Sequence, residues 1–112
     1  MKYNSKKRKF LKLQNQIRLK ILKTFRHLKK EDVGTAQEGQ SGPDIILSKT
    51  GLKLCPYQFE IKSQNRMATV YHWYNQANKK IPPTQDAVVV MKMNSRDPLV
   101  VLSVDHFFDL IK

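Results

Sequence analysis

Acidic residues are absent from the first 30 residues of this 112-residue chain, a segment that holds twelve lysines and arginines. Residues 31–112 carry nine basic and nine acidic side chains, so the whole net charge of +12 belongs to the N-terminal segment. Such a block suits a polyanion, because each neutralised phosphate releases condensed counterions. The charge also fits a solvated helix face, or a basic tail attracted to anionic lipid or ribosomal RNA.

Other scarcities exclude further classes of protein. Cys55 is the only cysteine, so an internal disulfide is impossible, and we expect an intracellular protein with Cys55 as a small buried hydrophobe. No apolar run approaches the roughly 18 residues of a membrane span, and the charged, apolar and small-residue order of a signal peptide is not seen. We therefore expect no membrane partner. There is no glycine-rich phosphate loop and no CxxC pair, and the three histidines have no metal-ligand spacing. The length predicts a single domain over residues 1–112, with a basic N-terminal extension and helix in residues 1–30.

Hydrophobic periodicity predicts an α/β fold, with a central mixed β-sheet flanked by helices. Residues 1–9 are expected to be frayed, and apolar residues at helical spacing predict a helix over residues 10–28. Gly39, Gly42 and Pro43 lie in a loop by composition. Further helices are expected at 68–80 and at 105–111, the last capped by Asp105. Strands are expected at 44–48, 57–63, 86–93 and 99–102, with a short one possible within 31–37. The 57–63 strand is expected to pair with 44–48, and the 86–93 strand to be central and buried on both faces.

The most informative residues are two carboxylates and a lysine. Pro43-Asp44 begins one expected strand, and Glu60-Ile61-Lys62 lies in the next. Strict alternation places Glu60 and Lys62 on the same face of that strand. The carboxylates can hold a divalent cation, with the lysine beside the water that attacks a phosphate. The alternatives are a turn role for Asp44 after Gly-Pro, and an exposed ion pair between Glu60 and Lys62.

Pro-Asp followed by Glu-x-Lys on a neighbouring strand resembles the PD-(D/E)XK nuclease superfamily. The closer similarity is to small phage and prophage endonucleases related to archaeal-type Holliday junction resolvases. The residues that carry this resemblance lie at 32–48, 56–64 and 97–108, within a span from 32 to 108 that covers about two thirds of the chain. It implies a restriction-endonuclease-like core in the order α-β-β-β-α-β, here followed by a further strand and a short helix. Two departures stand out, because residues 1–30 lack the acidic residue of many relatives and Pro43 stands where close relatives often have Glu.

The resemblance also implies a set of site residues. Asp44, Glu60 and Lys62 are the expected catalytic residues, and Asp44, Glu60 and the main-chain carbonyl of Ile61 the expected metal ligands. Glu38 is a further candidate ligand, equally well explained as a solvated loop carboxylate. Gln64 and Gln76 are expected in supporting roles. The expected cofactor is Mg²⁺, with Mn²⁺ able to substitute. The residues expected to bind DNA are Lys6, Lys7, Arg8, Lys9, Lys12 and Arg18.

These expectations describe a magnesium-dependent endodeoxyribonuclease that hydrolyses phosphodiester bonds, selects branched DNA as Holliday junction resolvases do, and works in the cytoplasm of a bacterial or phage-infected cell. A homodimer is expected, because resolving a junction requires paired cuts, with the C-terminal apolar residues, Phe108 among them, at its interface. The alternatives are a nicking endonuclease without junction selectivity, a basic nucleic-acid-binding module without catalysis, and a small RNA-binding protein.

Overall fold

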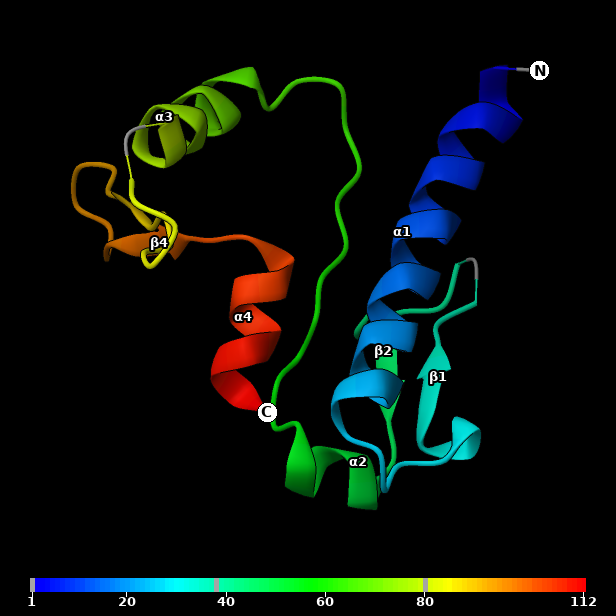
Figure 1. Cartoon of the computed structure of the whole chain (residues 1–112). Coiled ribbons are helices and arrows are strands. Elements are labelled where there is room, and N and C mark those ends of the chain that lie inside the picture. Colours follow the sequence, from blue (N-terminus) through cyan, green and yellow to red (C-terminus); the bar gives the residue numbers. More distant parts are fainter. Residues whose placement is uncertain (1, 38, 80) are drawn as a thin grey trace. The chain divides into compact units, whose positions relative to one another are not determined.

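The computed structural model describes residues 2–37, 39–79 and 81–112, with the side chains of residues 2–4 excepted. The chain divides into two compact units, Met1–Ser63 with Lys112, and Gln64–Ile111. The described residues form a small mixed α/β structure with four α-helices and two separate two-stranded antiparallel sheets (Figure 1). The expected single mixed sheet is therefore wrong for the described residues.

The first unit begins with the long helix α1 (Lys2–Thr24). Its sequence contains no glycine or proline and is rich in Lys, Leu, Arg and Gln, all strong helix formers. The helix therefore includes residues 2–9, which were expected to be frayed. Ile17 and Ile21 form its buried stripe, and it ends in a turn where the Leu28 amide donates to the Phe25 carbonyl (3.0 Å).

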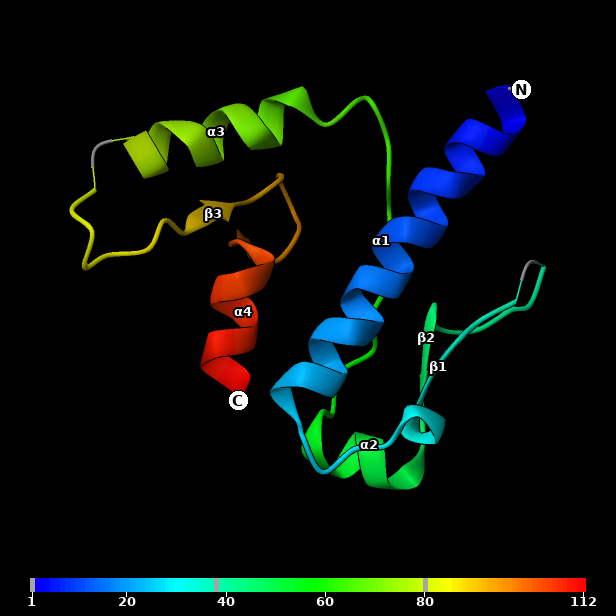
Figure 2. The same ribbon diagram turned by 45° about the vertical axis from the view of Figure 1, so that its right-hand side comes forward.

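Helix α1 lies along a hairpin of β1 (Val33–Thr35) and β2 (Ile45–Leu47), as Figure 2 shows. Val33 pairs with Leu47 and Thr35 with Ile45. Val33 and Ile45 are buried, and the Arg18 Nε donates to the Val33 carbonyl (2.8 Å), fastening α1 to β1. The partner of β2 in this sheet is thus the short strand that the sequence only allowed for.

Residues 57–63, expected to be a strand, form no ladder in the described structure, although the Asp44 amide donates to the Phe59 carbonyl (3.3 Å). The expected strand at 57–63 is therefore wrong for the described residues, although this main-chain bond does join the two segments. The expected alternation is confirmed at its centre, because Ile61 is buried whereas Glu60 and Lys62 are exposed.

A short helix, α2 (Lys49–Leu54), follows β2. The Ser48 hydroxyl caps it by accepting from the Gly51 amide (3.0 Å) and itself donates to the Asp32 carboxylate (2.7 Å). A side chain at Gly51 would crowd the unit, because its Cβ would lie 3.1 Å from the Asp32 carbonyl oxygen. Cys55, just after α2, is fully buried, as expected, and desolvation raises the pKa of its thiol.

The hydrogen bonds to the Asp32 carboxylate predict that the stability of the folded protein depends on pH. Hydrogen bonds from the Lys29 amide and the Ser48 hydroxyl hold the pKa of Asp32 below its ordinary value of 3.8. A carboxylate with a lowered folded-state pKa contributes fully above pH ~4, and the contribution is lost as pH falls through the folded-state value. We expect Asp32→Asn to unfold less steeply with acid than wild type, measured by circular dichroism from pH 6 down to ~2. The control is Glu31→Gln, and equal acid profiles for wild type and Asp32→Asn would contradict the prediction.

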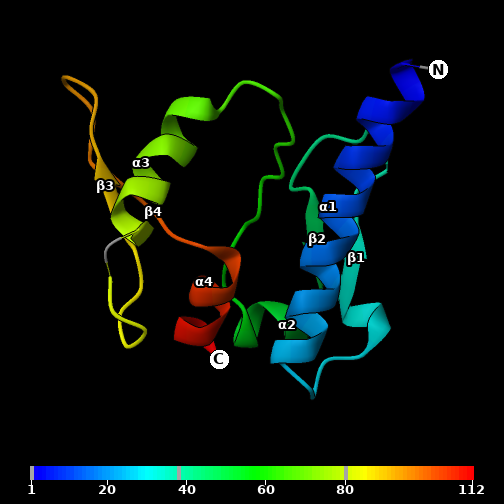
Figure 3. The same ribbon diagram turned by 45° about the horizontal axis from the view of Figure 1, so that its top comes forward.

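The second unit contains α3 (Ala68–Lys79), the strands β3 (Val89–Met91) and β4 (Leu99–Val101), and α4 (Val104–Ile111). In Figure 3, α3 lies beside the β3–β4 hairpin, in which Val90 pairs with Val100. Val90 is 70% exposed, so β3 is not the doubly buried central strand that was expected. The helices at 68–79 and 104–111 agree with the expected ranges to within one residue. The predicted cap at Asp105 is wrong, because the Ser103 hydroxyl caps α4 by accepting from the His106 amide (3.1 Å).

Phe108 is buried in the second unit, where its ring packs edge-on against Phe107 with centroids 5.3 Å apart. With 4% of its surface exposed, Phe108 itself offers little area to a second copy, and the expected dimer interface stays a prediction. Other apolar residues of the same region are exposed, namely Leu99, Val100 and Leu110.

Candidate active site

Asp44 joins three segments of the first unit. It follows Pro43 and precedes β2, and its carbonyl oxygen accepts from the Ala36 amide (3.1 Å) and from Nε2 of Gln14 on α1 (2.9 Å). Its carboxylate Oδ2 accepts a short hydrogen bond from the Ile61 amide (2.6 Å). The main chain of Asp44 thus holds the hairpin to α1, while its side chain reaches the Glu-x-Lys segment.

Glu60 and Lys62 lie on either side of Ile61 and face solvent. The Glu60 side chain is 77% exposed and the Lys62 side chain 62% exposed, and Nζ of Lys62 lies 3.9 Å from Oε2 of Glu60. An ion pair at this distance and exposure contributes little to stability. Both charged groups are accessible to a ligand, and the neighbouring Ile61 amide ties this segment to Asp44.

Gln14 is a site residue that the sequence did not reveal. Its exposed fraction is 2%, and among the described residues it is the polar residue that is classed as buried. It lies on the same face of α1 as the buried Ile17 and Ile21. A buried amide must be hydrogen-bonded, and its partner here is the Asp44 carbonyl. The available signal was a glutamine at an apolar position of the helical stripe, which indicates a buried polar contact without identifying its partner.

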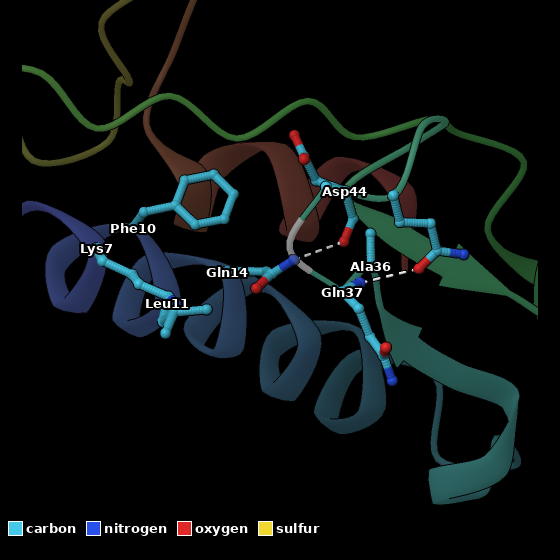
Figure 4. Close-up of a pocket in the computed structure, with 9 residues that line it drawn as sticks. Lys7, Phe10, Leu11, Gln14, Ala36, Gln37 and Asp44 are labelled. Carbon is cyan, nitrogen blue, oxygen red and sulfur yellow. Dashed lines mark hydrogen bonds between the residues drawn. The ribbon is translucent and has the colours of Figure 1, made fainter.

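A pocket of roughly 360 Å³ opens between α1 and the loop that joins β1 to β2. Figure 4 shows Lys7, Phe10 and Leu11 on α1, facing Ala36, Gln37 and Asp44. The Phe10 ring stands on the side of the helix that faces Asp44. Gly39, with φ 79°, and Gln40 complete the lining, and the Gln40 side chain accepts from the Gln37 amide (2.9 Å).

The other predicted site residues are distributed as follows. Glu38 lies outside the described residues. Lys6, Arg8, Lys9 and Lys12 are exposed on α1, whereas Lys7 is half-buried at the pocket. Arg18, which was expected to bind DNA, donates to the Val33 carbonyl and, at 3.5 Å, to the Lys30 carbonyl. It therefore also has a structural role that the sequence did not predict. Gln64 and Gln76 belong to the second unit, where both are exposed, and their supporting roles stay predictions.

The oxygen atoms of Asp44, Glu60 and Ile61 are of the chemical type that a hard cation binds. Asp44 Oδ2 is engaged by the Ile61 amide, the exposed Glu60 carboxylate follows Phe59 in the same segment, and the Ile61 carbonyl supplies a neutral oxygen. Carboxylate and carbonyl oxygens are the protein ligands that Mg²⁺ prefers. Within the described part of the chain, which omits Glu38, no three His, Cys, Asp or Glu side chains are grouped closely enough to hold a metal by themselves.

None of the helices among the described residues has both the length and the apolar character needed to cross a membrane. No protein-family model, curated protein or solved structure matches the chain.

Proposed function

We propose that this protein is a magnesium-dependent DNA endonuclease that selects branched or otherwise irregular DNA, as Holliday junction resolvases do. The observation that supports it best is the 2.6 Å hydrogen bond from the Ile61 amide to the Asp44 carboxylate. This bond joins the Pro-Asp segment to the Glu-x-Lys segment, two pieces of chain separated by fifteen residues. A purely structural Asp44 would need no exposed carboxylate and ammonium on the segment that it binds.

In this proposal Asp44, Glu60 and the Ile61 carbonyl hold the cation. A bound Mg²⁺ offsets negative charge that develops on a phosphodiester during hydrolysis and lowers the pKa of water. Asp44 is kept in place by its own main-chain bonds to Ala36 and Gln14, so its carboxylate approaches the substrate from a fixed backbone. Glu60 is exposed and can take its position with the substrate.

Lys62 acts on the phosphate by its charge. Its ammonium group is exposed on the same side of the segment as Glu60. A cation placed next to the reacting phosphate stabilises the transition state, whose negative charge exceeds that of the ground state, and it orients the attacking water.

The exposed basic residues of α1 hold the DNA backbone. Lys6, Arg8, Lys9 and Lys12 are exposed on the helix whose Gln14 contacts Asp44, so bound phosphates lie in the same unit as the proposed catalytic groups. Phosphate contacts position the duplex without reading its sequence, which favours selection by DNA shape.

A homodimer completes the proposal, because one site cuts one strand and resolving a junction requires two cuts. The exposed apolar residues Leu99, Val100 and Leu110 are the surface we assign to it. Sedimentation of the wild type at micromolar concentration should give twice the 13.1 kDa chain mass. A monomer both free and on four-way DNA would rule out junction resolution.

The proposal is tested by incubating the full chain with end-labelled linear, flap and four-way DNA, in Mg²⁺, in Ca²⁺ and in EDTA. We expect cleavage in Mg²⁺, greatest on the branched substrates, and binding without cleavage in Ca²⁺, whose coordination is looser. Binding without cleavage in every metal would identify a nucleic-acid-binding module instead. Equal cleavage of all three DNAs would identify a nicking endonuclease without junction selectivity.

A further inference from the structure

The pocket beside Asp44 has a lining that fits a nucleobase. Phe10 supplies an aromatic face, and Leu11 adds apolar surface. Gln37 and Gln40 also line the pocket, and a glutamine amide can both donate and accept hydrogen bonds, as base edges do, although Oε1 of Gln40 already accepts from the Gln37 main-chain amide. The volume, roughly 360 Å³, lies within the range of small-ligand sites, about 300 to 1,000 Å³.

Charge and position restrict the ligand further. Lys7, which is half-buried, lines the pocket and adds a positive charge to it. Asp44 lines the same pocket, so the ligand's neighbouring phosphodiester would lie at the proposed catalytic residues. A base within a paired, stacked duplex presents its face to its neighbours and cannot enter such a pocket, whereas an unpaired base can.

The geometry points to this pocket as the binding site for one unpaired nucleobase of the DNA substrate, stacked on Phe10 next to the reacting phosphate. This inference rests on the proposed function, because it takes Asp44 as the marker of the reacting position. It names the feature by which the protein selects irregular DNA, namely a nucleotide free to leave the stack at a branch, gap or bulge. Base stacking on an aromatic side chain tolerates any base, in agreement with recognition by structure.

The test measures binding alone, in EDTA, by fluorescence anisotropy. Two duplexes of the same length and flanking sequence are compared, one fully paired and one with a short central run of unpaired nucleotides. We expect the wild type to bind the second about tenfold more tightly. Phe10→Leu should lose most of this preference, whereas Phe10→Tyr, which keeps the aromatic ring, should retain it. Affinity for the paired duplex should be the same in all three proteins, because it depends on the basic residues.

Two further variants make the result decisive. Leu19→Ala removes an exposed apolar side chain from α1 away from the pocket and should leave the preference unchanged. Gln37→Ala alters an exposed residue that lines the pocket and should reduce the preference for the duplex with unpaired nucleotides. If circular dichroism shows that Phe10→Leu is misfolded, the result for Gln37→Ala is used in its place. An absent preference in the wild type, or an equal one in wild type, Phe10→Leu and Gln37→Ala, would overturn the inference.

The same measurements separate this inference from the proposed function. Suppose that the wild type prefers unpaired DNA in EDTA, that the pocket variants lose this preference, and that the wild type cleaves no DNA in Mg²⁺. The pocket inference then stands, and the proposed nuclease function is wrong. If the wild type instead cleaves DNA in Mg²⁺ but binds both duplexes equally, the proposed nuclease function stands and the pocket inference is wrong.

Discussion

Asp44→Asn should lower DNA cleavage at least about 100-fold while leaving DNA affinity unchanged or slightly higher. The substitution removes the negative charge that a divalent cation requires. It keeps the shape of the side chain and an oxygen that can accept from the Ile61 amide. The bonds that Asp44 makes to Ala36 and Gln14 use its main-chain carbonyl and are unaffected. Weaker repulsion toward phosphate explains any gain in affinity.

The measurement pairs a single-turnover cleavage rate in Mg²⁺ with an anisotropy titration in Ca²⁺ on the same four-way DNA. The matched control is Glu31→Gln, which removes one exposed carboxylate from the same unit and should cleave at the wild-type rate. Cleavage by Asp44→Asn at the wild-type rate would remove Asp44 from the catalytic site. Parallel loss of cleavage and of the thermal unfolding transition would instead give the Asp44 carboxylate a structural role.

Replacing Lys6, Arg8, Lys9 and Lys12 together with Gln should weaken binding to all DNAs alike. All four are exposed on α1, and Gln has nearly the same helix propensity as Lys and Arg, so the helix should persist. The slope of log affinity against log salt should flatten by about 0.9 for each phosphate that the variant no longer neutralises, and by at most ~3.6 for four. Lys7 and Arg18 are left in place, because Lys7 lines the pocket and Arg18 bonds to β1.

A variant from which four charges are removed elsewhere is the control for this experiment. Lys53, Lys79, Lys92 and Arg96 are exposed and lie outside α1, so replacing all four with Gln lowers the net charge equally without touching the helix. This control should keep nearly the wild-type slope. Equal slopes for the two variants would mean that the attraction depends on net charge alone and that α1 is not the binding surface.

Periodic segments of the chain were predictable, and segments defined by distant partners were not. The spacing of Ile17 and Ile21 identified α1, and the alternation around Ile61 correctly separated its buried side chain from those of Glu60 and Lys62. Residues 57–63 have that alternation without a ladder, because side-chain pattern does not record where hydrogen-bond partners lie. The apolar run at β3 predicts a doubly buried strand, although Val90 is exposed in a two-stranded sheet.

The candidate site shows the same division. The Pro-Asp and Glu-x-Lys residues could be selected from their chemistry, and the structure links them through the Ile61 amide. Gln14 and the pocket beside it could not be predicted, since both depend on how α1 meets the loop before β2. The cap of α4 is the Ser103 hydroxyl and not the expected Asp105, because both residue types favour that position and sequence alone does not rank them here.

Gly51 provides a reference position for interpreting how homologous sequences differ. Its Cβ would approach the Asp32 carbonyl oxygen and the Leu47 side chain, so selection for folding alone should keep glycine there, whatever the protein does. Glu60 and Lys62 are exposed and add little to folding, so only selection for chemistry would preserve them together. A homologue that keeps Gly51 but lacks Glu60 and Lys62 should fold in the same way and should not carry out the proposed reaction.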